Sequence, residues 1–210
     1  MTVSEFKKIY WDYYISLEND FINTEKYVAL DEDNKKTFSI EYMKIFQMVC
    51  AEIDVFSKVF CSIIDANFNK ETIAHYCKVL TTEYADFTKD RVHIIPLNKD
   101  ITPWDSWSWQ ENQNTQGKIS VTGNSPQWWS EHNKVKHSRT LFTSSGFNFK
   151  KANQKNVIYS LAALFQLEMY LYRKLTTYDK VETKPSQLFK MTDWEEVVIS
   201  LNNGYATLSD

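Results

Sequence analysis

Long runs in which apolar side chains recur at steps of three and four residues limit what this chain can fold into. The longest covers residues 39–65, where Ser39 can act as an N-cap and Glu41 suits the positive end of a helix dipole. Side chains at this spacing share one face of an α-helix, so the run predicts a long helix. Its expected buried face consists of Tyr42, Ile45, Phe46, Val49, Ile53, Phe56, Phe60 and Ile63.

The same spacing predicts helices over residues 3–22, 69–87 and 152–175, and a last short helix over residues 194–201. Ser125 followed by Pro126 signals one more helix start, because a missing backbone N–H costs nothing in a first turn. The chain holds only four Gly and four Pro, too few for a turn-rich sandwich or barrel. We therefore predict an all-α fold, a helical bundle of about five main helices in a single domain, residues 1–210.

A different pattern interrupts the helices at residues 88–125, which we expect to form a Trp-rich insertion containing a hairpin. The apolar run 92–95 predicts a strand that pairs with residues 119–121. Between them lie Trp104, Trp107 and Trp109, which can stack on bases or another ligand, or fold back onto the helices.

Three cysteines, Cys50, Cys61 and Cys77, occupy apolar positions of the predicted helices and are expected to be free, buried thiols. No apolar run approaches the roughly 18 residues of a membrane span, and the N-terminus shows no signal-peptide pattern. We expect a cytoplasmic protein with no membrane partner. The net charge of −3 excludes a strongly basic protein that coats nucleic acid.

The most chemically suggestive stretch is residues 128–139, which combines aromatic, amide, imidazole and basic side chains. In a helix, Trp129, Asn133 and His137 lie on one stripe, with Lys136 beside it. Residues 131–155 hold six basic side chains and one acidic side chain, Glu131. This local excess of positive charge suits a phosphodiester, although an ordinary solvated helix face has the same appearance. The basic residues are Lys134, Lys136, Arg139, Lys150, Lys151 and Lys155.

Other kinds of site find little support in this stretch. His132 and His137 are five residues apart, so a helix turns them about 140° from each other and prevents joint metal binding. The sequence has no Gly-x-Ser-x-Gly elbow and no glycine loop that cradles phosphate. We expect no metal and no cofactor. The chemistry that remains is His137 as a general acid or base, one turn after Asn133.

Asn133, three intervening residues and His137, followed by a long helix rich in alanine and leucine, resemble the HEPN superfamily of helical proteins. Members typically carry an arginine directly before the polar residue, and here His132 occupies that position. By this resemblance, His137 moves protons, Asn133 orients the phosphate or the histidine, and His132, Arg139 or a nearby lysine neutralises charge. Lys134, Lys136, Arg139 and Trp129 would contact the substrate.

The resemblance implies an RNA-directed protein of the prokaryotic toxin or phage-defence type, acting as a metal-independent endoribonuclease. It also implies a homodimer, with RNA and an antitoxin or other defence-system protein as partners. The alternative is a non-catalytic helical module for interaction or dimerisation, in which the polar stripe of residues 129, 133 and 137 ties helices together.

Overall fold

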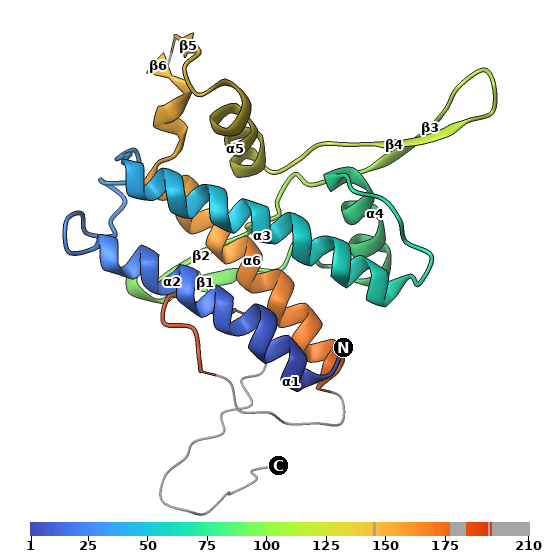
Figure 1. Cartoon of the computed structure of the whole chain (residues 1–210), viewed down its shortest axis with the longest axis horizontal. Coiled ribbons are helices and arrows are strands. Elements are labelled where there is room, and N and C mark those ends of the chain that lie inside the picture. Colours follow the sequence, from blue (N-terminus) through green and yellow to red (C-terminus); the bar gives the residue numbers. More distant parts are fainter. Residues whose placement is uncertain (145, 177–183, 193, 195–210) are drawn as a thin grey trace, which may run out of the picture.

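The computed structural model describes residues 1–144, 146–176, 184–192 and 194, and its centre is the packing of two long helices (Figure 1). Helix α3 spans Ile40–Ile64 and helix α6 spans Gln154–Leu175. Ser39 caps α3 by accepting a hydrogen bond from the backbone N of Tyr42 at 3.0 Å, and Asn153 caps α6 in the same way. Both helices were predicted from the sequence and are confirmed within two residues at each end.

The N-terminal segment forms one helical stretch with a wider turn inside it. Helix α1 (Val3–Phe6) continues through the π-helical turn η1 (Lys7–Trp11) into α2 (Asp12–Thr24), which confirms the helix predicted over residues 3–22. This stretch lies against α3 and α6. Its buried side chains are mainly aromatic: Phe6, Tyr10, Trp11, Tyr14 and Phe21.

Two shorter helices complete the helical part. Helix α4 (Ile73–Glu83) packs on α3 and is shorter than the predicted range 69–87. The chain leaves the helix at Tyr84 so that Phe87 enters the core, where its carbonyl accepts a hydrogen bond from Nε2 of Gln166 at 2.6 Å. Helix α5 (Gln127–Ser138) begins directly after Pro126, as predicted.

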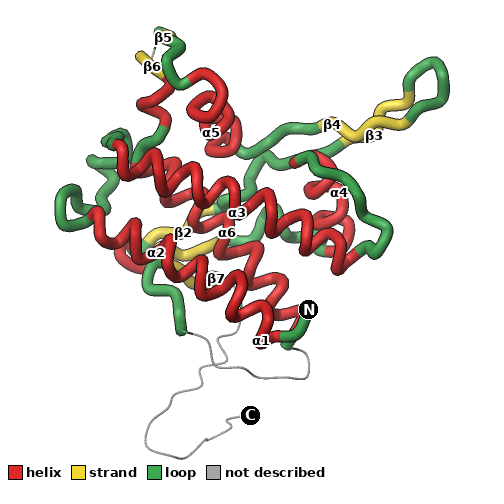
Figure 2. The backbone as a smooth tube through the Cα atoms, viewed as in Figure 1, coloured by secondary structure: helices red, strands yellow, loops and turns green. Residues whose placement is uncertain are grey.

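The chain is not purely all-α, because small antiparallel sheets accompany the helices (Figure 2). Strands β2 (Lys99–Ile101), β1 (Val92–Ile94) and β7 (Phe189–Met191) form a sheet in that order. Strands β3 (Gln110–Gln113) and β4 (Ile119–Thr122) form a projecting hairpin, and β5 (Phe142–Thr143) pairs with β6 (Gly146–Phe147). Short 3₁₀ turns, η2 (Ile95–Leu97) and η3 (Asn148–Lys151), follow β1 and β6.

The predicted pairing of residues 92–95 with residues 119–121 is wrong. Each strand instead finds a nearer antiparallel neighbour: β1 pairs with β2 after a tight turn, and β4 pairs with β3. The other edge of β1 is covered by β7, which lies far along the chain. The short helix predicted over residues 194–201 lies outside the described residues except for Trp194.

The Trp-rich insertion folds back onto the helices. Trp104 and Trp107 are buried, with ring centroids 4.2 Å apart, and Nε1 of Trp104 donates to the carbonyl of Ala163 in α6 at 3.2 Å. Trp109 is partly exposed and donates to Oγ1 of Thr81 at 3.0 Å. The first two tryptophans are therefore core residues rather than a stacking surface.

The three cysteines are free and buried, as predicted, and burial raises the pKa of each thiol. In the described part of the chain, no helix has the length and apolar character that crossing a bilayer requires.

Two fully buried glutamates have opposite surroundings. Glu18 in α2 accepts hydrogen bonds from the Tyr14 hydroxyl, the Ser186 hydroxyl and the backbone N atoms of Gln187 and Leu188. These bonds hold the segment that leads into β7. Glu168 in α6 has no hydrogen-bond partner among the described residues. Burial, and secondarily the charge of Glu52, raises the pKa of Glu168 well above its ordinary value.

We expect Glu168→Gln to stabilise the protein at pH 7–8 by on the order of 1–3 kcal/mol, because it removes a buried carboxylate without a partner. The raised pKa means that the wild type loses stability as pH rises from about 4.3 towards the folded-state pKa, and the variant should lose this dependence. Urea unfolding at several pH values measures both effects. Glu18→Gln is the matched control and should be destabilising, since an amide nitrogen cannot accept the bonds that Glu18 accepts.

Candidate functional site

Helix α5 is held against α3 by its aromatic side. Trp128 is buried and its Nε1 donates to the carbonyl of Pro103 at 2.7 Å, while Val135 is buried about two turns later. Trp129, predicted as a substrate contact, is half-buried and packs against Trp128 and His132, with ring centroids 5.8 and 5.5 Å away. These contacts fix which face of α5 is turned outward.

His132 belongs to the inner face. Its side chain is 5% exposed and lies between Trp129 and Phe46 of α3, with ring centroids 5.5 and 5.6 Å away. Its Nδ1 has no partner among the described residues. Burial, followed by the charges of Lys136 and His137, lowers the pKa of His132 to about 4. The imidazole is therefore neutral at pH 7, and this argues against His132 as a cation that replaces the missing arginine.

Asn133 and His137 lie one turn apart on the outward part of α5, as the sequence predicted for a helix. Asn133 is half-buried and His137 is exposed. Within the described ranges, neither side chain has a hydrogen-bond partner. Asn133 and His137 therefore form no hydrogen bond that ties α5 to another described segment, and both side chains are available to a ligand.

The predicted basic cluster is partly neutralised by Glu131, which is buried on the inner side of α5. Lys134 and Lys151 place their Nζ atoms 3.0 and 3.4 Å from its carboxylate oxygens. These ion pairs join α5 to the turn η3. Lys134, predicted to contact substrate, thus has a structural partner, and the two lysines and one carboxylate together keep a net charge of +1.

Four basic side chains of the cluster form no ion pair with any described carboxylate: Lys136, Arg139, Lys150 and Lys155. Arg139, just after α5, contacts Sδ of Met43 in α3 through Nη1 at 3.9 Å. Lys150 lies over the ring of Phe38, 5.5 Å from its centroid. Lys136, Arg139 and Lys150 therefore leave unpaired positive charge at the C-terminal end of α5 and beyond it, whereas Lys155 lies apart from them, at the start of α6.

The sequence interpretation missed the exposed apolar residues that follow this end of α5. Leu141, Phe142 and Phe147 all expose large apolar side chains on and beside the β5–β6 hairpin. The sequence signal was the run Leu-Phe-Thr followed by Gly146-Phe147, because a glycine between two short runs can form the turn of a hairpin. In the structure Gly146 adopts a φ of +94°, which favours glycine. Each strand is only two residues long, so the sequence shows no alternation of apolar and polar side chains that would have predicted the hairpin.

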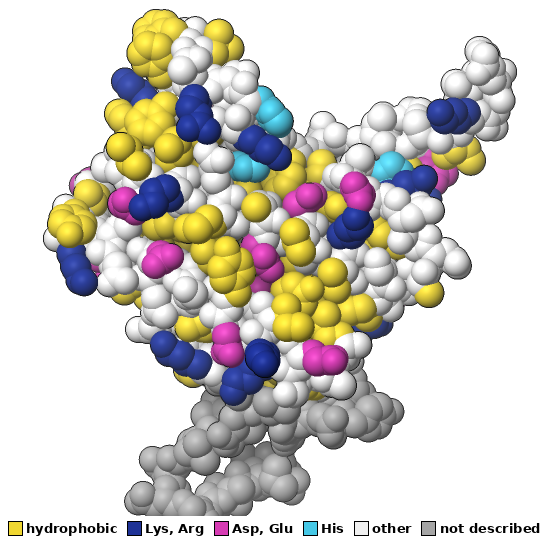
Figure 3. Space-filling view, in the orientation of Figure 1, with side chains coloured by type: hydrophobic (Ala, Val, Ile, Leu, Met, Phe, Trp, Pro, Cys, Tyr) yellow, Lys and Arg dark blue, Asp and Glu magenta, His cyan; other side chains and the backbone are white. Residues whose placement is uncertain are grey.

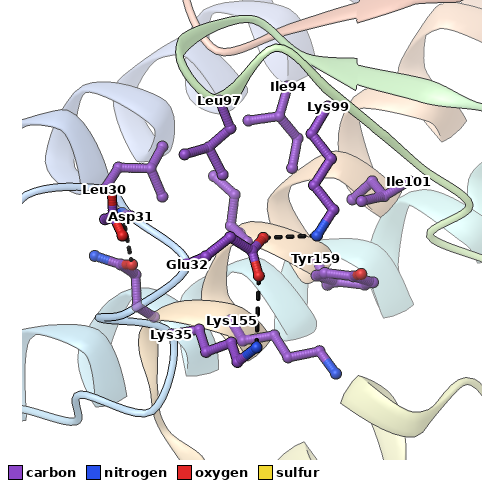
Figure 4. A pocket seen from close by; sticks show the side chains of 12 residues that line it. Leu30, Asp31, Glu32, Lys35, Ile94, Leu97, Lys99, Ile101, Lys155 and Tyr159 are labelled. Atoms are coloured by element: carbon purple, nitrogen blue, oxygen red, sulfur yellow. Dashed lines mark hydrogen bonds and ion pairs between the residues drawn. The ribbon is translucent and has the colours of Figure 1, made fainter.

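A separate hollow of about 150 Å³ lies between the α2–α3 loop, the β1–β2 turn and the start of α6 (Figure 4). The carboxylate of Glu32 lies between Lys99 and Lys35, with Nζ–Oε distances of 2.6 and 3.5 Å. Lys155, the sixth cation of the cluster, stacks over Tyr159 here. The backbone N atoms of Gln154 and Lys155 donate to carbonyls of the loop, so the start of α6 offers them to no anion.

Most charged groups of this hollow pair with one another, and the α2–α3 loop accepts the backbone hydrogen bonds at the start of α6. Within residues 1–144, 146–176, 184–192 and 194, no group of three or more His, Cys, Asp or Glu side chains is placed to hold a metal ion. The outward face of α5 is therefore the stronger candidate site.

Comparison of the chain with models of protein families, with curated proteins and with solved structures found no match in any of the three.

We expect an NMR titration to show His132 titrating near pH 4. An unfolded histidine titrates near 6.5, so stability should be full above that pH and fall as pH drops towards 4. His132→Asn should weaken this acid dependence of the free energy of unfolding, whereas His137→Asn, on the exposed side, should leave it intact. A His132 pKa above 6 would contradict its burial against Phe46 and Trp129.

Proposed function

We propose that this chain is a HEPN-like, RNA-directed protein of the prokaryotic toxin or phage-defence type, with its helices serving as a bundle scaffold. The observation that carries the proposal is the outward face of α5. There, exposed His137 and half-buried Asn133 lie one turn apart without hydrogen-bond partners in the described residues, next to the basic Lys136 and Arg139. An imidazole, an amide and unpaired cations are the groups that bind and transform a phosphodiester.

In the catalytic form of the proposal, His137 takes the proton of a ribose 2′-hydroxyl. The 2′-oxygen forms a bond to phosphorus as the bond from phosphorus to the 5′-oxygen breaks, and the leaving 5′-oxygen receives a proton from a second imidazole. Asn133 orients the phosphate by donating from its amide. The products are a 2′,3′-cyclic phosphate and a 5′-hydroxyl, and no metal takes part.

Arg139 is the residue we assign to charge neutralisation. The position before Asn133 is held by His132, which is buried and has a pKa of about 4. Arg139 is exposed, lies two residues after His137 and contacts Met43 only through one guanidinium nitrogen. A guanidinium remains charged at any physiological pH and can form two hydrogen bonds to one phosphate.

The second imidazole would come from another copy of the chain. One chain presents a single exposed histidine on α5, so a homodimer that brings two α5 faces together supplies both a base and an acid. A cytoplasmic antitoxin or other defence-system protein that covers this face would silence it.

A non-catalytic interaction or dimerisation module is the second candidate, and one observation favours it. The arginine position carries a neutral, buried histidine, and phosphoryl transfer depends strongly on stabilising developing negative charge. In this form the α5 face would bind RNA or another chain without cleaving anything.

The catalytic form predicts that purified protein in EDTA cleaves mixed RNA to 2′,3′-cyclic phosphate ends. His137→Ala should reduce the rate at least 100-fold, because general acid–base catalysis typically contributes about 10²–10⁴. The cyclic ends can be read by their resistance to 3′ ligation and to phosphatase until acid opens the cyclic phosphate to a monoester. His75→Ala is the matched control, since His75 lies on α4 and bonds to Thr72.

Absence of cleavage in wild-type protein that binds RNA would remove the catalytic form and retain the binding module. Equal loss of activity in both histidine variants, with a lowered Tm, would attribute the effect to folding.

RNA binding itself should depend strongly on salt. Lys136→Gln and Arg139→Gln should each lower the slope of log affinity against log salt by about one, since each removes one phosphate contact. Lys44→Gln is the control because Lys44 already pairs with Glu41 at 2.8 Å. Fluorescence anisotropy with a labelled RNA at several salt concentrations measures the slopes, and slopes identical to wild type would remove α5 from the interface.

A further inference from the structure

Large apolar side chains are exposed at the end of the molecule that carries the β5–β6 hairpin. We call them the tip surface: Phe38, Ile40, Leu141, Phe142 and Phe147. Phe142 is 68% exposed and Phe147 is 48% exposed. Figure 3 shows hydrophobic side chains beside Lys and Arg at this end. Exposed apolar groups that gather in one place commonly mark a binding surface.

Specific contacts connect side chains of the tip surface to one another and to their neighbours. The rings of Phe142 and Phe147 meet edge to face with centroids 5.0 Å apart. Phe38 meets Phe149 edge to face at 5.6 Å, and the Lys150 side chain runs from Gly146 to the ring of Phe38. Gly146 is needed here, because a Cβ would lie 3.2 Å from Cδ of Lys150 and the backbone φ is +94°.

The hairpin is also joined to the end of α5. The backbone N of Asn148 donates to the carbonyl of Leu141, and the backbone N of Phe149 donates to the carbonyl of Arg139, both at 3.0 Å. Asn148 is buried and its side chain donates to the carbonyl of Ser138 at 2.9 Å. These bonds hold the tip surface in a defined place directly after His137 and Arg139.

We propose that the tip surface stacks unpaired bases of single-stranded RNA while Arg139 and Lys150 bind the phosphates between them. This inference rests on the proposed RNA-directed function and names the substrate class of the same face. Three of the five side chains are phenyl rings, and a ring face stacks on any base. The two cations stand on either side of Phe142 and Phe147 in the chain, and neither has a carboxylate partner among the described residues.

The position of Lys150 favours RNA over a lipid bilayer. Its ammonium lies over the Phe38 ring, 5.5 Å from the centroid, and its side chain passes beside Gly146. Insertion of the rings into a membrane would carry this charge towards the hydrocarbon, which is unfavourable. A chain of alternating phosphates and bases instead places negative charge among the rings, where the lysine already is.

The inference predicts selectivity for unpaired RNA, because the bases of a duplex stack on one another and offer no faces to a phenyl ring. Bases held on the tip surface would direct the backbone past Arg139 to His137.

The test measures binding of the full chain to a labelled 12-nucleotide single strand, to the same strand with abasic sites, and to a blunt duplex. Phe142→Ala/Phe147→Ala should weaken binding of the intact strand at least tenfold, since stacking gains about 5- to 150-fold per base. On the abasic strand, variant and wild type should bind equally. Phe142→Trp/Phe147→Trp should restore binding, and Ile119→Ala, an exposed apolar residue on β4, is the control.

An equal loss on intact and abasic strands would overturn base stacking, as would no loss on either. The tip surface would be assigned to membranes if the wild type binds vesicles rich in phosphatidylserine and the double alanine variant does not, while both bind RNA with the same affinity. A change of oligomeric state in the variant with unchanged RNA affinity would assign it to a second copy of the chain.

If wild type binds none of the RNAs, the proposed function fails together with this inference. If it binds and the variants match it, only the inference fails.

Discussion

The rest of the structure depends on the burial of α6. Between Val157 and Glu168 every side chain except that of Tyr159 is buried, because α3 covers one side while the β2-β1-β7 sheet and the Trp-rich insertion lie on the other (Figure 1). Ala162 and Ala163 leave room for this close approach, and the carbonyl of Ala163 accepts the indole N–H of Trp104. A helix covered on all sides gains most of its stability from packing rather than from intrinsic propensity.

The full burial of α6 places polar side chains in the core, and these side chains differ in whether they form hydrogen bonds. Gln166 ties α6 to the turn that follows α4 through the carbonyl of Phe87, while Glu168 stays without a partner among the described residues. Glu18, on the helix that covers α6, instead holds the segment leading to β7 by three hydrogen bonds and accepts a fourth from the Tyr14 hydroxyl of its own helix. A buried carboxylate can therefore organise a distant segment or carry an energetic cost, depending on the donors that surround it.

The packing of α5 on α3 decides which groups a ligand can meet. Once Trp128, Val135 and His132 face inward, a helix turns His137 about 140° away from His132 and so outward. In the motif that resembles the HEPN pattern, the first position, His132, is therefore buried. The second and last positions, Asn133 and His137, are accessible. Lys136, Arg139 and Lys150 lack an acidic partner in the described residues, and the tip surface continues from Arg139 and Lys150.

The sequence by itself determined the long helices, the burial of the cysteines and the spacing that puts Asn133 and His137 on one stripe, because these follow from local periodicity. Only the tertiary structure decided the rest. The pairing of β1 with β7 joins segments almost one hundred residues apart, and the choice of neighbour depends on chain path rather than on strand composition. Which cations of residues 131–155 have an acidic partner was also decided by the fold, because Glu131 is held between Lys134 and Lys151. The neutral state of His132 likewise comes from Phe46, a partner on another helix, since burial against a distant residue leaves no mark in the local pattern.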